Sequence, residues 1–301
     1  MAEDIGKIIN NGFGTYTRNL NICIPFILNF FVSGLLALLI IIFGFVYIFA
    51  PSLSDVENVK SPEAAASILL PLISGHIMEI VILAILILLV VFFIQAYFTS
   101  GAIGMAIQAT DSGRSSLSTM TDAGKKNLVN MFLAEILFGL LSLAGIVFIV
   151  PGAMKIDISQ ISNPGNTGSY ALFFSGFLLW VAYLVILSII LAVFKYALVA
   201  DNIGPIESMI AAVSFFKKNK SDVLLLFLII LLISIFYVII DQVMGGIAII
   251  NIIWGFINIF ISLVVIPPLT TIWWVRLYLA RTGRHLYFDD LLAHPNELNH
   301  L

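Results

Sequence analysis

Six long stretches of this chain carry almost no charge, and they constrain its fold more than any other feature. Charged residues are absent from 19–54, 80–110, 158–194, 223–240 and 242–275, and Glu135 is the only one between 127 and 154. Each stretch reaches the roughly 18 residues that a helix needs to cross about 30 Å of hydrocarbon. The sequence therefore predicts an all-α polytopic membrane protein with six transmembrane helices, near 24–50, 77–99, 128–150, 172–197, 223–241 and 252–278.

The amino-acid composition is that of a membrane domain made up almost entirely of these spans. Hydrophobic residues make up 61% of the 301 residues and charged residues only 10%, whereas soluble domains carry about 25% charged residues. We therefore expect a single integral membrane domain over residues 1–301. The net charge is −3 and the chain has no long basic tract, so we do not expect it to bind nucleic acid.

The lysines and arginines predict the orientation of the chain. Of the 14, only Lys60 and Lys155 lie in the first, third and fifth connections; the rest lie in the N-terminal segment, the second and fourth connections, or the tail. An inserting chain retains its basic connections on the cytosolic side. We therefore expect a multi-pass protein of the cell membrane whose N- and C-termini are both cytosolic.

A basic residue followed by asparagine stands before three of the predicted spans. These pairs are Arg18-Asn19, Lys126-Asn127 and Lys218-Asn219. Each follows roughly 15 residues of mixed polarity and precedes two apolar segments. The chain is thus predicted to contain three pseudo-repeats of two spans each, at about 1–100, 101–200 and 201–301.

A second pattern marks the place where each predicted repeat ends. A polar residue stands shortly before Gly113, Gly204 and Gly283. Glycine tolerates a positive φ and so suits a chain that leaves one helix and turns into another. We interpret these segments as turns, with a ligand site as the alternative.

The segments before the basic-Asn pairs are predicted to form short cytosolic interfacial helices. One helical face gathers Ile5, Ile8, Ile9, Phe13 and Tyr16 in the first segment, and Ile206, Met209, Ile210, Val213 and Phe216 in the third. The stripe of the second segment, 117–127, is weaker. Such a helix can lie among lipid headgroups or pack against the ends of the spans. Membrane lipids and a membrane protein are the expected partners, with candidate docking residues Arg18, Lys126, Lys217, Lys218 and Lys220.

The segment from Tyr196 to Lys220 carries a sharper pattern. An apolar stretch ends in an acidic residue and is followed by Gly-Pro, a Glu, a Ser and a basic-Asn pair; the matching residues are Asp201, Gly204, Pro205, Glu207, Ser208, Ser214, Lys218 and Asn219. This pattern resembles the integral membrane domain of glycerophosphoryl diester phosphodiesterases and of related uncharacterised prokaryotic, notably archaeal, six-span proteins. In those phosphodiesterases a separate soluble domain carries the chemistry. The resemblance thus implies the membrane architecture without the enzymatic activity.

Five polar residues in or beside the spans are candidates for a functional or structural role. Glu135 lies inside the third span, where an unpaired charge costs roughly 2.5–3.5 kcal/mol, so we expect it to face protein, water or a basic partner. Lys195 and Arg276 are the candidate partners. Glu135 is interpreted either as part of a structural ion pair, or as a protonated carboxyl, or as part of a proton or substrate relay. Gln95 and Asn258 are expected to tie spans together.

Two hypotheses about function follow from the sequence. The first is a non-enzymatic membrane protein that organises lipids or a membrane partner through its cytosolic segments. The second is a transporter or permease component for a small solute, because internal repeats often frame a site in mid-membrane; Pro267-Pro268 would interrupt the sixth span. A membrane-embedded enzyme acting on lipid has the least support, because the spans contain no convergent set of His, Asp or Glu residues. The sequence also contains no Gly-rich phosphate loop, nucleophile elbow or His-Glu-x-x-His stretch. We predict no catalytic residue, metal site or cofactor.

Overall fold

The computed structural model describes residues 3–49, 73–155, 167–246, 248–284 and 286, and these residues form helices and turns without a strand. Six of its helical segments are long and apolar enough to cross a membrane: Leu20–Phe49, Ile77–Ser112, Leu117–Phe148, Tyr170–Asp201, Lys220–Gly245 and Ile252–Arg281. The prediction of an all-α fold with six spans is confirmed. Lys60, most of the connections around 50–72 and 156–166, and the tail after 286 lie outside the described residues.

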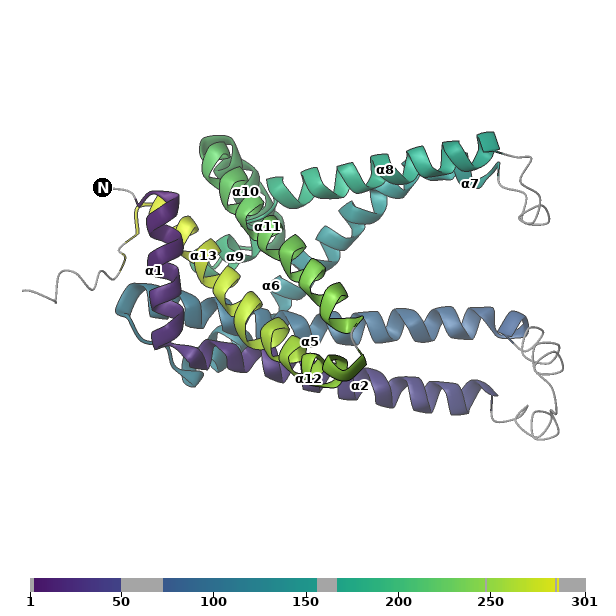
Figure 1. Ribbon diagram of the computed structural model, residues 1–301, viewed down its shortest axis with the longest axis horizontal. Coiled ribbons are helices and arrows are strands. Elements are labelled where there is room, and N and C mark those ends of the chain that lie inside the picture. Colours follow the sequence, from purple (N-terminus) through teal and green to yellow (C-terminus); the bar gives the residue numbers. More distant parts are fainter. Residues whose placement is uncertain (1–2, 50–72, 156–166, 247, 285, 287–301) are drawn as a thin grey trace, which may run out of the picture.

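The helices keep the labels of Figure 1. In chain order they are α1 (Ile5–Arg18), α2 (Ile24–Phe49), α5 (Ile77–Ser112), α6 (Leu117–Ala144), α7 (Val150–Ala153), α8 (Thr167–Ile190), α9 (Phe194–Asp201), α10 (Pro205–Lys218), α11 (Lys220–Gly245), α12 (Ala248–Phe260) and α13 (Ile266–Arg281). Short 3-10 turns precede α2 and follow α6, and a π-helical turn at Ile261–Val265 joins α12 to α13.

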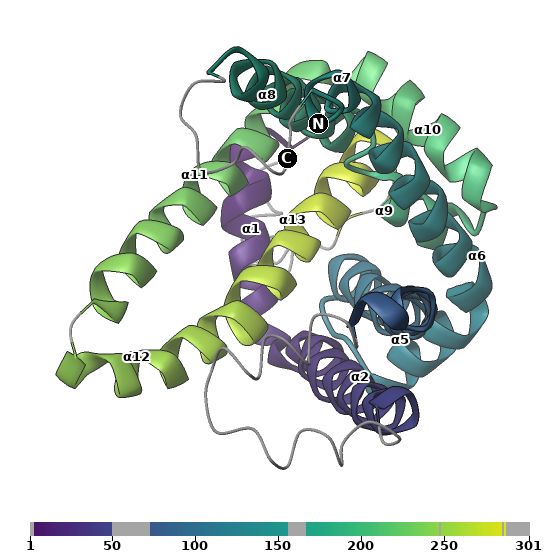
Figure 2. The same cartoon turned by 90° about the vertical axis from the view of Figure 1, so that its right-hand side faces the viewer.

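Three pairs of helices diverge from one common end of the molecule (Figures 1 and 2). The pairs are α2 with α5, α11 with α12, and α8 with the C-terminal end of α6 and the short turn and helix α7 that follow it. At the common end, α1, α9 and α10 gather around the C-terminal part of α13. We call this end the base, and it also contains the C-terminal half of α5 and the N-terminal half of α6.

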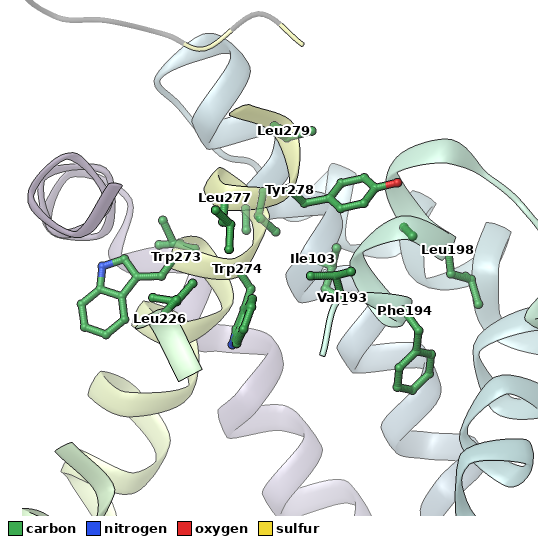
Figure 3. Close-up of a cluster of buried hydrophobic side chains, with 14 of the residues drawn as sticks. Ile103, Val193, Phe194, Leu198, Leu226, Trp273, Trp274, Leu277, Tyr278 and Leu279 are labelled. Atoms are coloured by element: carbon green, nitrogen blue, oxygen red, sulfur yellow. The ribbon is translucent and has the colours of Figure 1, made fainter. Parts of the chain in front are cut away.

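The hydrophobic core lies in the base. Every residue of α13 from Thr271 to Leu279 is buried, and side chains from α5, α9 and α11 converge on it (Figure 3). By contrast, no residue of α2 between Phe26 and Tyr47 is buried. The apolar surfaces of the diverging helices are therefore open, as expected for helices that a bilayer surrounds.

Helix α5 is too long to lie within a bilayer. Its 36 residues extend over about 54 Å, whereas the hydrocarbon core measures about 30 Å. The part of α5 that extends beyond the predicted span 77–99 contains most of its buried residues and lies in the base. Part of α5 therefore extends beyond the hydrocarbon.

The second predicted interfacial helix does not exist as a separate element. Helix α6 runs unbroken through Lys126-Asn127, whereas the chain leaves helical geometry at Asn19 (φ −128°) and Asn219 (φ −127°). All three asparagine side chains donate to the carbonyl four residues earlier, at 3.0, 3.0 and 3.1 Å. This shared hydrogen bond therefore does not by itself end a helix.

The turns that close the predicted repeats contain a residue with positive φ. Gly113 (φ 78°) and Gly283 (φ 74°) adopt this conformation as predicted. In the second turn Asn202 adopts it instead (φ 54°), and Gly204 is the N-cap of α10. Asparagine is among the few non-glycine residues that tolerate this region.

Two of the six spans are interrupted. The fourth span, predicted near 172–197, is present as Tyr170–Asp201, but a short turn separates the end of α8 at Ile190 from the start of α9 at Phe194. The sixth contains the π-helical turn, and Pro267 and Pro268 follow in the first turn of α13, as the sequence predicted. Proline lacks the N–H that would donate to the carbonyl four residues earlier.

Glycines allow neighbouring helices to touch. A Cβ atom on Gly104 of α5 would lie 2.3 Å from the Cβ of Ala123 on α6. A Cβ atom on Gly176 of α8 would lie 2.2 Å from the carbonyl oxygen of Phe148. Small residues of this kind let backbones approach closely where helices cross.

Candidate functional site

Glu135 forms an ion pair with Lys195, one of its two predicted partners. The Lys195 ammonium lies 2.9 Å from Oε1 of Glu135, which is 6% exposed, while Lys195 is 29% exposed. Within the described residues Oε2 of Glu135 has no hydrogen-bond partner. The pair joins α6 to α9 next to the interruption of the fourth span.

Arg276, the other predicted partner, does not reach Glu135. Its guanidinium donates to both carboxylate oxygens of Glu3, at 2.8 and 2.7 Å, and each residue is only 2% exposed. Asn11 donates to the same carboxylate at 2.8 Å, and Arg276 also donates to Thr15 at 3.3 Å. Arg276 therefore binds the N-terminal segment to α13, and of the two alternative partners of Glu135 the structure selects Lys195.

Two further ion pairs fix the C-terminal end of α13. Arg281 donates to Asp222 at 2.6 Å and to the carbonyl of Glu3 at 2.7 Å. Tyr278 and Arg284 both donate to Asp201. Asp201, the acidic residue of the pattern between Tyr196 and Lys220, thus holds the chain that follows α13. No sequence pattern indicates this contact.

Helix α1 covers the interruption of the sixth span. The Tyr16 hydroxyl and the Cys23 thiol donate to the carbonyl of Val264, four residues before Pro268, at 2.9 and 3.1 Å. Burial, reinforced by the neighbouring Cys23, raises the pKa of Tyr16 to about 12, so its hydroxyl stays protonated and donates at neutral pH. The apolar face of α1 is therefore used within the protein.

Of the two predicted tying residues, Asn258 joins two spans. It donates to Asp241 of α11 and accepts a hydrogen bond from Tyr237, and Trp254 also donates to Asp241 at 2.8 Å. Gln95 is partly buried on α5, and none of the side-chain hydrogen bonds recorded for the described residues involves it. The structure therefore gives a geometric role to Asn258 alone.

One long face of helix α10 is buried in the protein and the opposite face is exposed. Ser208, Ala212 and Phe215 are buried against the base. Ile206 and Ile210, from the predicted apolar stripe, are each 64% exposed. In α1 most of the corresponding stripe is covered, because Ile5, Ile8 and Tyr16 are buried. Among the predicted interfacial helices that form, α10 is the one with an open apolar face.

Beside this open face lies a groove between α10, α8 and α6, which we call the α10 groove. Its volume is about 460 Å³, and it is lined by Leu141, Leu187, Ile190, Leu191, Met209, Ile210, Val213, Ser214 and Lys217. All the lining residues but the last two are hydrophobic. A smaller pocket of about 300 Å³ lies between α5, α6 and α9 and includes Asp122 and Lys126. Neither is lined by Glu135, Gln95 or Asn258.

The five predicted docking residues are all exposed at the base. Arg18 ends α1, Lys126 lies on α6, Lys217 and Lys218 end α10, and Lys220 begins α11. They do not form one cluster. Of the five, Lys217 is the one that lines the α10 groove.

Groups of three or more His, Cys, Asp or Glu side chains that could hold a metal ion are absent from the part of the chain that the structure describes. Four acidic side chains, Glu3, Glu135, Asp201 and Asp222, instead accept hydrogen bonds from arginines, a lysine or a tyrosine. Their arrangement is that of structural anchors.

Removing either member of the Glu135–Lys195 pair should have unequal effects. Lys195→Met leaves a buried carboxylate without its cation and is expected to destabilise the protein by about 3 kcal/mol. Glu135→Gln leaves a partly exposed lysine, whose long chain can carry its charge toward water, so we expect about 1 kcal/mol. Chemical unfolding in mild detergent measures both. A larger loss for Glu135→Gln would contradict this account.

The chain was compared with protein families, curated proteins and solved structures. Residues 63–276, which include the α10 groove and the Glu135–Lys195 pair, match the family model described as Domain of unknown function (DUF7847). No curated protein and no solved structure matches the chain. Because the family model covers more than two thirds of its length, the chain belongs to the DUF7847 family.

Proposed function

We propose that this protein is a non-enzymatic membrane protein that organises lipids at the cytosolic leaflet of the cell membrane. The observation that carries the proposal is the open apolar face of α10, on which Ile206 and Ile210 are exposed. A helix with an exposed apolar face and lysines beside it binds in the interface of a membrane with anionic lipids. Lys217, Lys218 and Lys220 supply the positive charge.

The distribution of charge supports a cytosolic base. The described lysines and arginines lie at the base, except for Lys155, which follows α7 at the opposite end. This asymmetry is the one that insertion produces when the base faces the cytosol. Anionic lipids of the cytosolic leaflet attract such lysines by about 1 kcal/mol each.

The shared asparagine hydrogen bonds and the positive-φ turns support the proposal of three related units. In this proposal the third unit keeps its interfacial helix free for lipid, while the first uses it to cover the sixth span. The likeness to the membrane domain of glycerophosphoryl diester phosphodiesterases is part of the same proposal and implies no enzymatic activity.

Lipid selectivity at the protein surface tests the proposed function. Spin-labelled anionic and zwitterionic phospholipids are compared in vesicles that contain the purified protein. We expect the wild type to enrich the anionic lipid in the motionally restricted fraction, and Lys217→Gln/Lys218→Gln/Lys220→Gln to lose most of that enrichment. Lys125→Gln/Lys126→Gln is the control for charge alone and should lose less. Equal fractions of both lipids around the wild type would refute the proposal.

A transporter or permease component is the second candidate, and one observation favours it. The fourth and sixth spans are interrupted, and interrupted helices frame substrate sites in many transporters. Glu135 next to the first interruption would then take part in a relay. Proton flux into vesicles, measured with an entrapped pH dye, tests this role. Flux through the wild type that Glu135→Gln abolishes without loss of folded protein would favour transport over lipid organisation.

A further inference from the structure

The polarity of the lining changes along the length of the α10 groove. Hydrophobic side chains from three helices form most of it, while Ser214 and Lys217 stand toward the C-terminal end of α10. Its volume of about 460 Å³ falls in the range of small-molecule sites, roughly 300–1,000 Å³. A ligand that fits must combine an apolar chain with a group that accepts hydrogen bonds from an ammonium ion.

The spacing of α10 places Lys217 in line with the apolar stripe. Ile206, Ile210, Val213 and Lys217 follow at intervals of four, three and four residues, so they share one helical face. Lys218 lies about 100° further around the helix and does not line the groove. The two adjacent lysines thus differ in what they can contact.

We propose that the α10 groove is a binding site for one anionic phospholipid of the cytosolic leaflet. One acyl chain lies along Leu187, Ile190 and Val213, and the phosphate accepts hydrogen bonds from Lys217 and Ser214. The inference rests on the proposed function and deepens it, because it assigns the lipid class and the site. Charge complementarity favours this occupant, because one phospholipid supplies both an acyl chain for the hydrophobic lining and an anion for Lys217.

Native mass spectrometry tests the site. The full-length protein is released from vesicles of equal amounts of phosphatidylglycerol and phosphatidylcholine, and retained lipids are counted. We expect one retained phosphatidylglycerol per wild-type chain. Val213→Trp fills the groove and should abolish retention, whereas Ile206→Trp, on the same face but outside the groove lining, should not.

The adjacent lysines form a matched pair of variants. Lys217→Gln should lower the preference for phosphatidylglycerol over phosphatidylcholine about fivefold to tenfold, the effect of one lysine near an anionic headgroup. Lys218→Gln should lower the preference by less than twofold, because Lys218 does not line the groove. Circular dichroism and size-exclusion chromatography confirm that each variant is folded.

Three outcomes would overturn the inference. Retention that survives Val213→Trp would place the lipid elsewhere, and equal effects of Lys217→Gln and Lys218→Gln would indicate general surface charge. Displacement of the lipid by soluble glycerol phosphate would indicate a phosphate site without a bound acyl chain. In each case the selectivity of the spin-labelled lipids can persist, so failure of the groove is distinguishable from failure of the proposed function.

Discussion

Replacing Arg276 with Met is expected to destabilise the protein by about 3–5 kcal/mol, the cost of leaving a buried charge without its partner. Arg276 and Glu3 are each 2% exposed and share two hydrogen bonds. Without the guanidinium, the carboxylate of Glu3 keeps only the weaker hydrogen bond from Asn11. Chemical unfolding in mild detergent measures the loss.

Two further variants test whether the loss of stability comes from a buried charge without a partner. Glu3→Gln/Arg276→Met removes both charges and should recover part of the stability that Arg276→Met loses. Arg284→Gln breaks a pair with Asp201 whose two side chains are 39% and 32% exposed, so it should cost no more than about 1 kcal/mol. A similar loss for Arg276→Met and Arg284→Gln would show that the pair at Glu3 is not a central anchor of the base.

Gly176→Ala should be the most damaging single-methyl change in the spans. The added Cβ would lie 2.2 Å from the carbonyl oxygen of Phe148, and because the obstacle is backbone, α8 has to move away from the third span. Overpacking of this kind costs about 1–3 kcal/mol, and we expect the upper end. The midpoint of thermal unfolding in detergent reports the change.

Gly34→Ala is the matched control. Gly34 also lies within a span, but a Cβ atom there would meet nothing within 4 Å. The substitution should be neutral or stabilise the helix by up to about 1 kcal/mol, since alanine is the better helix former. If Gly34→Ala were as damaging as Gly176→Ala, backbone contact at Phe148 could not be the cause.

Local sequence patterns predicted the six spans, the interruption of the sixth span and two of the three turns, because each of these depends on the chemistry of a few neighbouring residues. Uncharged stretches marked all six spans because the cost of burying charge in hydrocarbon acts on every residue. Pro267-Pro268 marked the interruption of the sixth span, since proline cannot donate to the helix. The glycines marked two of the three turns, and asparagine replaced glycine in the third because both tolerate positive φ.

The features that depend on tertiary contacts could not be predicted. Nothing between Ile190 and Phe194 is a helix breaker, so the interruption of the fourth span arises from packing at the base. The Glu3–Arg276 pair joins residues 273 positions apart, and no pattern connects them. Both faces of α10 contain apolar residues, so the sequence could not tell which face binds the protein and which stays open.

The most direct test of the central claim is the environment of α10 in the membrane. Spin labels on Ile210→Cys and Lys218→Cys, in a Cys23→Ser background that removes the single native cysteine, report contact with lipid through collisions with oxygen and contact with water through collisions with a soluble nickel complex. We expect the label at 210 to collide with oxygen and the label at 218 to collide with nickel added from the cytosolic side. Equal exposure of both labels to nickel, or access from the opposite side alone, would contradict this expectation.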